Sequence, residues 1–144
     1  TTDFIFGPST ALFENCEIRS KTNSYVTAAS TPEDIAVGYV FKNCKLTANP
    51  GVDKVYLGRP WRPYAATVFF NCEMGKHIRP EGWHNWGKEE NEKTARYAEY
   101  NSTGEGAAAA GRVKWAKQLT KKEAAQYDDL NYIYRMCSDW KPEN

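Results

Sequence analysis

The sequence has no long apolar run, no surplus of either charge and very little histidine, and each shortage excludes a class of protein. None of its 144 residues belongs to an apolar segment long enough to cross a bilayer, so no membrane is expected as a partner. Its 19 Lys and Arg are matched by 18 Asp and Glu. Nucleic-acid-binding proteins normally carry a basic surplus, so no nucleic acid is expected either.

Metal ligands are equally scarce. His77 and His84 are the only histidines, and no third ligand follows them at the short spacing typical of metal sites. The four cysteines are widely separated as well. We therefore predict no metal site.

Aromatic residues, in contrast, are abundant. Five Trp, nine Tyr and six Phe are more than the core of a small domain usually needs, so some are expected at the surface. Residues 57–61 read Leu-Gly-Arg-Pro-Trp and place the permanent charge of Arg59 beside the indole of Trp61. A guanidinium binds carboxylates through two parallel hydrogen bonds and an indole packs on sugar rings, so the motif fits a carbohydrate-acting site.

A repeat of constant spacing, the Asn-Cys repeat, runs through the first part of the chain. Residues 11–18, 39–46 and 67–74 share the pattern apolar, Phe, variable, Asn, Cys, variable, apolar, and they follow one another at equal intervals. The pattern is strand-like but changes phase at the Asn-Cys pair, which indicates a bend between two short strands. One such unit cannot bury its apolar face, so the units must stack. We predict an all-β fold, a right-handed parallel β-helix, over residues 1–83.

In a parallel stack, equivalent residues of successive coils lie one above another. This predicts an interior ladder of aromatic rings and an amide ladder at the bend, formed respectively by Phe13, Phe41 and Phe69 and by Asn15, Asn43 and Asn71. The repeat cysteines are predicted to be free thiols in the core: Cys16, Cys44 and Cys72. Cys137 stands outside the repeat.

The repeat is lost after about residue 83. Residues 84–144 are expected to form loops and short helices that pack on the solenoid within the same domain. Thr120 and Glu123 have the spacing of a capping box at the start of one helix, and Asp128 is a candidate cap for a second at residues 129–136.

Asp3 and Arg59 occupy the same phase of the Asn-Cys repeat, because Arg59 stands as far before Asn71 as Asp3 stands before Asn15. If the loops keep this register, the two Cα atoms are about 10 Å apart on one face, a span that the side chains close. The intervening coil offers only small residues at this phase, Thr31 and Pro32, which leave the approach open. We predict that Arg59 holds Asp3 as an ionised carboxylate, a nucleophile or a stabiliser.

Several motifs resemble those of pectin methylesterases and follow the order of that family. They are Asp-Phe-Ile-Phe-Gly at 3–7, Leu-Gly-Arg-Pro-Trp at 57–61, Gly-Trp at 82–83, Tyr-Ala-Glu-Tyr-Asn at 97–101 and Arg-Val-Lys-Trp at 112–115. The resemblance implies a right-handed parallel β-helix that hydrolyses the methyl esters of galacturonate units in pectin without a metal or cofactor. It implies that Asp3 is the nucleophile, that Arg59 orients it, and that aromatic residues line the sugar-binding cleft: Phe6, Trp61 and Trp83, with Tyr64 as a further candidate.

In that family the general acid and the glutamines that donate to the oxyanion lie on the coil before the nucleophile, in a Gln-Asp-Thr-like motif. This sequence contains no Gln-Asp pair, and its only glutamines are Gln118 and Gln126. We therefore expect a C-terminal half of a catalytic domain, inactive alone, that self-associates or pairs with a separate N-terminal half. A polymeric substrate implies secretion to the cell exterior or the periplasm.

Three other readings remain open. The first is a lyase or glycoside hydrolase on the same fold, which would require calcium-binding acidic clusters or a pair of catalytic carboxylates. The second is a non-catalytic carbohydrate-binding or structural solenoid. The third is a family relative that acts on a different ester or thioester.

Overall fold

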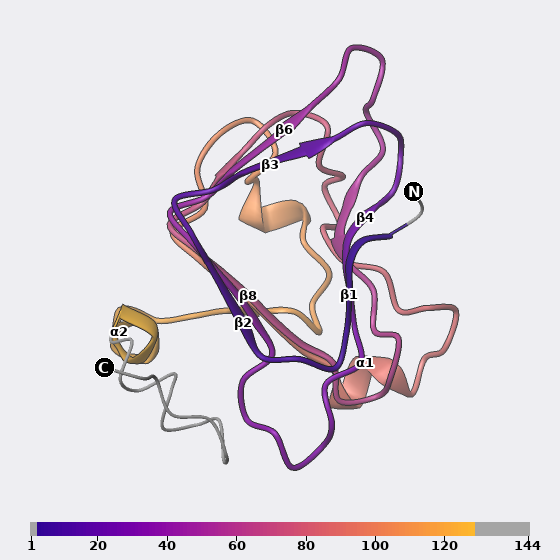
Figure 1. The fold of residues 1–144 in the computed structure, drawn as a ribbon, viewed down its shortest axis with the longest axis vertical. Helices are drawn as coiled ribbons and strands as arrows, with labels where there is room; N and C mark the ends of the chain where they lie inside the picture. Colours follow the sequence, from indigo (N-terminus) through magenta and orange to yellow (C-terminus); the bar gives the residue numbers. More distant parts are fainter. Residues whose placement is uncertain (1–2, 129–144) are drawn as a thin grey trace.

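The computed structural model describes residues 3–128 of the chain. They form a parallel β-helix of roughly triangular cross-section, in which three sheets make the three sides (Figure 1). In the view of Figure 1 the chain turns clockwise as it recedes from the viewer, so the β-helix is right-handed. The predicted fold class is confirmed.

Each sheet collects strands from successive coils, and all the pairs are parallel. The first sheet contains β1 (Asp3–Gly7), β4 (Tyr25–Ala29) and β7 (Tyr56–Gly58). The second contains β2 (Ala11–Glu14), β5 (Tyr39–Lys42), β8 (Ala66–Phe70), β10 (Arg96–Tyr100) and β11 (Lys117–Gln118). The third contains β3 (Glu17–Ser20), β6 (Lys45–Ala48) and β9 (Glu73–Met74). The short helices α1 (Asn91–Thr94) and α2 (Lys121–Ala125) and the 3-10 turns Ala109–Gly111 and Gln126–Asp128 complete the described chain.

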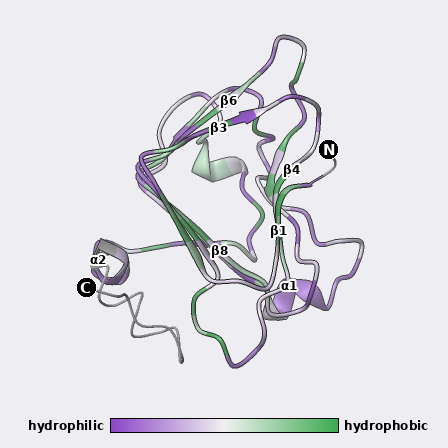
Figure 2. Ribbon diagram, viewed as in Figure 1, coloured by the Kyte–Doolittle hydropathy of each residue, from purple (hydrophilic) through white to green (hydrophobic). Residues whose placement is uncertain are grey.

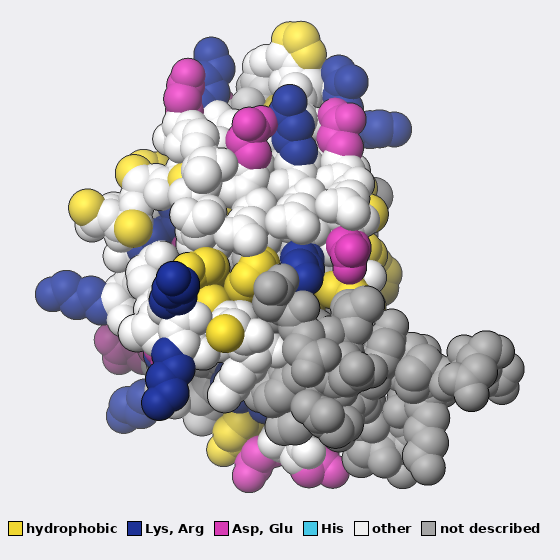
Figure 3. Space-filling model, turned by 90° about the vertical axis from the view of Figure 1, so that its left-hand side faces the viewer, with side chains coloured by type: hydrophobic (Ala, Val, Ile, Leu, Met, Phe, Trp, Pro, Cys, Tyr) yellow, Lys and Arg dark blue, Asp and Glu magenta, His cyan; other side chains and the backbone are white. Residues whose placement is uncertain are grey.

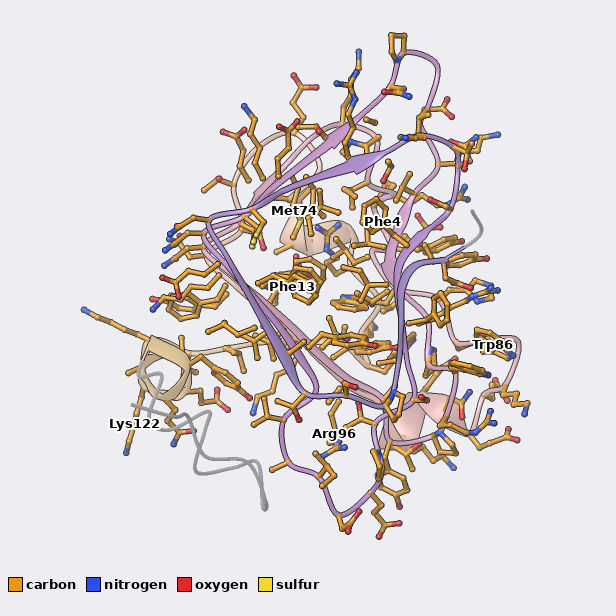
Figure 4. The ribbon with its side chains drawn as sticks, in the orientation of Figure 1. Phe4, Phe13, Met74, Trp86, Arg96 and Lys122 are labelled. Atoms are coloured by element: carbon orange, nitrogen blue, oxygen red, sulfur yellow. The ribbon has the colours of Figure 1, made fainter. Side chains whose placement is uncertain are left out.

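The predicted aromatic ladder fills the centre of the β-helix. The rings of Phe13 and Phe41 stack at 4.8 Å between centroids and those of Phe41 and Phe69 at 4.6 Å, in each case within 10° of parallel. Figure 4 shows Phe13 and Met74 inside the triangle of strands. Hydrophilic residues gather instead on the outer loops and on α1 (Figure 2). The stack follows from the register, since Phe41 pairs with Phe13 on one side and with Phe69 on the other.

The repeat asparagines form the bend between the second and third sheets. Asn15, Asn43 and Asn71 have φ angles of 57°, 56° and 53°, in the left-handed region that asparagine tolerates better than most residues. Asn101 is a fourth member, with φ 52°, and its side-chain amide donates to Asn71 Oδ1 at 2.9 Å. It was missed in the sequence because the step from Asn71 to Asn101 is longer than the constant interval between the earlier members.

Replacing Asn43 should reveal the cost of this backbone conformation. Asn43→Ala is expected to lower the free energy of unfolding by about 1–2 kcal/mol, because alanine crowds its own carbonyl at positive φ. Asn43→Gly should cost clearly less, since glycine adopts that conformation freely. Urea unfolding of the two variants makes the comparison, and an equal loss in both would contradict the backbone explanation.

The three repeat cysteines are free thiols, as predicted. Cys44 and Cys72 are buried, but Cys16 is exposed, so its predicted place in the core is wrong. The reason is its position on the first described coil. The two buried thiols donate to carbonyl oxygens of the coil before them, at Phe13 and Phe41, whereas Cys16 Sγ donates to Glu14 O on its own coil. Cys137 lies outside the described residues.

The second sheet continues beyond residue 83. Strand β10 pairs with β8, and β11 pairs with β10. In this register Glu99 takes the place that phenylalanine holds in the earlier coils, opposite Phe69, so the repeat pattern does not reveal the strand. Beyond it, α2 has the predicted capping box, with Thr120 Oγ1 accepting from the Glu123 N–H and the Glu123 carboxylate accepting from the Thr120 N–H. The helix predicted at 129–136 lies outside the described residues.

The third sheet carries charged side chains on its outer face. Lys45 and Glu73 form an ion pair at 3.4 Å, and Glu17 accepts a hydrogen bond from Thr47 Oγ1 at 2.9 Å. Acidic and basic side chains stand close together along the upper part of the face in Figure 3. Within residues 3–128, no helix has the length and apolar character needed to cross a membrane.

Candidate active site

Asp3 and Arg59 meet on the outer side of the first sheet. Arg59 Nε donates to Asp3 Oδ1 at 3.0 Å and Nη2 donates to Oδ2 at 2.9 Å. The two bonds form the bidentate geometry that an arginine makes with a carboxylate. The side chains are 18% and 19% exposed, so the pair is partly desolvated and still reachable from solvent.

The predicted contact is therefore present, but the register used to predict it is wrong. Asp3 pairs with Tyr25, and Tyr25 pairs with Tyr56, in two steps of unequal length along the chain. The constant spacing of the Asn-Cys repeat fails in this sheet because the loops that enter and leave its strands differ in length from coil to coil. Arg59 comes three residues after Tyr56, which lies in the same row across the sheet as Asp3 and Tyr25. Its long side chain extends back to the Asp3 carboxylate. Thr31 lies elsewhere, buried, where its hydroxyl accepts from the Ala66 N–H.

Arg59 is held between two aromatic rings. Its Cζ lies 4.0 Å from the ring centroid of Tyr25 and 4.0 Å from that of Trp86. Stacking of this kind stabilises a guanidinium by about 0.5–2 kcal/mol per ring and fixes the plane in which it donates. Neither partner was predicted: Tyr25 lies in the rung of Asp3, and Trp86 comes from the turn after the Gly-Trp motif. Figure 4 shows Trp86 outside the triangle of strands.

Local hydrogen bonds fix the turn that carries Trp86. The residue has a φ of 63°, and its N–H donates to His84 Nδ1 at 3.0 Å. The Gly87 N–H donates to Asn85 Oδ1 at 2.8 Å, and the Asn85 amide donates to Glu92 at 2.8 Å. These bonds define the conformation of the turn, in which the Trp86 ring lies against Arg59.

Phe6 and Trp61 form an exposed aromatic pair, three residues after Asp3 and two residues after Arg59 respectively. Phe6 is 63% exposed and Trp61 is 38% exposed, and their rings meet edge to face at 6.1 Å. An exposed apolar patch can mark a binding surface. Phe6 and Trp61 are the predicted aromatic residues that lie exposed close to Asp3 and Arg59 in the chain.

The two other predicted cleft residues lie elsewhere. Trp83 is 1% exposed and stacks on Tyr97 at 4.3 Å, so the prediction that it contacts a sugar is wrong for the chain described. Its ring packs against Gly58, the residue before Arg59, so closely that a Cβ at that position would lie 3.0 Å from the ring. The Tyr64 hydroxyl hydrogen-bonds Glu33, and this bond raises the pKa of Tyr64. The bond joins Tyr64 to the loop after β4 rather than to Asp3 or Arg59.

His84 lies next to the site, against two of its tyrosines. Burial lowers the pKa of His84 from its ordinary value of 6.5, and the positive charges of Arg59 and Arg79 lower it further. The imidazole meets the rings of Tyr25 and Tyr56 edge to face, at 5.8 and 5.2 Å. Within residues 3–128, no three His, Cys, Asp or Glu side chains are placed to hold a metal ion.

The lowered pKa of His84 predicts a pH dependence of stability. An unfolded histidine titrates near 6.5, so below that pH the unfolded chain binds more protons than the folded one. The free energy of unfolding should therefore decrease as the pH falls below 6.5 and through the folded pKa. His77, whose pKa is also lowered by burial, contributes in the same direction. An NMR titration of the His84 imidazole tests this, since Arg79→Gln should raise its pKa and Arg19→Gln should not. A pKa at or above 6.5 would contradict the prediction.

A family model described as Pectinesterase matches residues 1–136. The chain belongs to the pectinesterase family. Among individual pectinesterases, Pectinesterase 31 of Arabidopsis thaliana is 42% identical over 132 residues, which cover 91% of this chain and 42% of that protein.

Solved pectinesterase structures share the fold. Pectin methylesterase PemA from Erwinia chrysanthemi has a TM-score of 0.79 at 32% identity, over 99% of this chain and 49% of that one. Pectin methylesterase from carrot has a TM-score of 0.76 at 30% identity, over 92% of this chain and 49% of that one. The chain thus spans about half the length of these pectinesterases or less.

Proposed function

We propose that this chain supplies the nucleophile and the arginine of an active site that hydrolyses methyl esters of galacturonate units in pectin. The observation that carries the proposal is the bidentate pair of Asp3 and Arg59 beside the exposed rings of Phe6 and Trp61. Membership of the pectinesterase family supports the reaction class.

The geometry suits a carboxylate nucleophile. Arg59 donates to both Asp3 oxygens and is itself fixed by two rings, so the carboxylate is oriented before substrate arrives. In the proposed reaction an Asp3 oxygen attacks the C6 carbonyl carbon of the ester. The bond to the methoxy oxygen breaks, methanol leaves with a proton, and water then hydrolyses the acyl-enzyme anhydride and restores Asp3.

Two parts of this reaction need groups beyond those at the pair. Methanol leaves only if an acid protonates it, and the carbonyl oxygen needs hydrogen-bond donors as it becomes negative. Within residues 3–128, both hydrogen bonds to the Asp3 carboxylate come from Arg59. Gln118 is committed elsewhere, donating to Glu99 at the other end of the β-helix. We propose that the acid and the donors come from a further segment or a pairing partner.

The aromatic pair is proposed to bind the sugar. Phe6 and Trp61 offer apolar ring faces and edges next to the reacting carboxylate. A structure 30% identical to this chain, with a TM-score of 0.77, is described as a pectin methylesterase in complex with a hexasaccharide, which supports an oligosaccharide ligand. A polymer of this kind is met outside the cell or in the periplasm, where we place the protein.

A hybrid enzyme tests the proposal. Residues 1–136 would replace the matching segment of the carrot pectin methylesterase, and methanol release from methyl-esterified pectin would be measured. Asp3→Asn is expected to lower kcat by about 10⁴-fold or more, as loss of a nucleophile does. The exposed Asp53→Asn is the matched control and should leave the rate unchanged. A folded hybrid whose methanol release does not depend on Asp3 would overturn the proposal.

The isolated chain is expected to be far slower than the hybrid. Loss of a general acid alone costs about 10²–10⁴-fold in rate. The same methanol assay on the isolated chain checks this, and turnover comparable to the hybrid would contradict the need for a further segment.

A further inference from the structure

We propose that Arg79, lying on the ring of Tyr56, binds the free carboxylate of an already demethylated galacturonate unit, three rungs along the first sheet from Asp3. The inference rests on the proposed function, since it concerns the polymer that Asp3 would attack. It assigns to the chain an anion-binding subsite that selects pectin already demethylated near the reacting ester.

The register places Arg79 in line with Asp3. Asp3 pairs with Tyr25, and Tyr25 pairs with Tyr56. Val55 forms a parallel bridge with Ile78, and the Arg79 N–H donates to Val55 O at 2.8 Å, so Arg79 stands opposite Tyr56. Three steps of about 4.8 Å separate the Cα atoms of Asp3 and Arg79 by roughly 14 Å along the axis of the β-helix.

A stack of rings connects the two arginines on this face. The rings of Tyr25 and Tyr56 lie 5.3 Å apart and within 9° of parallel. Arg59 Cζ lies 4.0 Å from the Tyr25 centroid, and Arg79 Cζ lies 5.0 Å from the Tyr56 centroid. The two guanidiniums thus stand on one continuous aromatic support, which orients each of them.

The two arginines differ in what they bind. Arg59 is engaged by the Asp3 carboxylate through Nε and Nη2. Arg79 makes one side-chain hydrogen bond within residues 3–128, from Nε to Glu81 at 3.4 Å, and these side chains are 33% and 42% exposed. Its terminal nitrogens donate to no described residue and face partly to solvent. A long, exposed pair of this kind is weak, so a ligand carboxylate can compete with Glu81.

The chemistry of the group selects its ligand. A guanidinium binds a carboxylate through two charge-assisted hydrogen bonds, whereas a methyl ester has no charge and one fewer strong acceptor. His84 meets both tyrosine rings edge to face, so it lies against the aromatic stack that carries Arg79. Arg79 therefore distinguishes a demethylated unit from an esterified one, while Asp3 requires the ester.

Binding to the 144-residue chain tests the subsite without any turnover. A fully demethylated oligogalacturonate and its fully methyl-esterified counterpart would be titrated separately, with binding followed by NMR at the backbone amides of Tyr56 and Arg79. The demethylated oligomer should bind more tightly, and added salt should weaken it. Arg79→Gln should weaken its binding about tenfold, the usual effect of losing a charged hydrogen bond, and should barely change binding of the esterified oligomer.

Two further variants complete the design. Arg19→Gln removes an exposed arginine of the third sheet and should leave both affinities unchanged. Glu81→Gln removes the competitor of the ligand and should tighten binding of the demethylated oligomer. It decides the question if Arg79→Gln does not fold.

The proposal is overturned if Arg79→Gln binds the demethylated oligomer as well as the parent chain does, or if Glu81→Gln gains nothing. An equal loss for both oligomers would also overturn it, because shape rather than charge would then be recognised. Failure of the proposed function is a separate outcome: the hybrid would release no Asp3-dependent methanol even where Arg79-dependent binding persists.

Discussion

Arg112→Ala is expected to lower the free energy of unfolding by about 3–5 kcal/mol, because it leaves a buried carboxylate without its partner. Arg112 Nε donates to Glu99 Oε2 at 2.8 Å, Nη2 donates to Oε1 at 3.2 Å, and the side chains are 2% and 1% exposed. The same guanidinium donates to carbonyl oxygens of three further residues, at Arg79, Pro80 and Gly106. The pair thus joins β10 to the loops that follow β9 and β10.

Urea unfolding of two comparison variants separates charge from packing. Adding Glu99→Gln to Arg112→Ala should recover part of the loss, since a neutral amide replaces the unpaired carboxylate. Lys45→Ala breaks an exposed pair, with side chains 63% and 57% exposed, and should cost less than about 1 kcal/mol. A loss for Arg112→Ala as small as that for Lys45→Ala would contradict the buried-pair explanation.

Phe41→Ala is expected to cost about 3–5 kcal/mol, the usual loss for a fully buried phenylalanine. Phe41 is 0% exposed and has a ring stacked on each side, at 4.8 and 4.6 Å. Its removal opens a cavity in the middle of the ladder that neighbouring strands cannot close without breaking their pairing. Urea unfolding monitored by circular dichroism measures the loss.

Phe13→Ala is the matched variant at the end of the ladder. Phe13 is only partly buried and stacks on one phenylalanine, so its removal should cost clearly less than that of Phe41. An equal cost at the two positions would show that the first coil is packed as tightly as the second, contrary to the structure.

The Asn-Cys repeat was sufficient to predict two of the three sheets. Strands β2, β5 and β8 and strands β3, β6 and β9 keep its spacing. The two sets stay in phase because only the short asparagine bend separates them. The repeat did not reveal β10, where Glu99 replaces phenylalanine and the bend residue Asn101 comes two residues late. It also placed Cys16 in the core, whereas the two buried cysteines are those whose coils have a described coil before them.

The site was predictable in part. Asp3 and Arg59 were recognised from their motifs, and their contact is present although the register argument for it was wrong. Tyr25 and Trp86 were missed because stacking on Arg59 depends on loop lengths and on a turn with positive φ, which have no repeat pattern. Trp83 was misplaced because a Gly-Trp motif does not indicate which face of the turn the indole takes.

The sequence by itself determined the β-helix, its aromatic ladder, the asparagine bend, the family and the two residues at the centre of the site. These depend on spacing along the chain and on short motifs, which are local properties. Only the tertiary structure decided the register of the first sheet and the burial of Trp83. It alone also decided that two aromatic rings stack on Arg59 and that Asp3 and Arg79 are aligned across the first sheet. Those depend on how loops of unequal length bring distant strands together, so they arise from packing between coils rather than from the pattern within one.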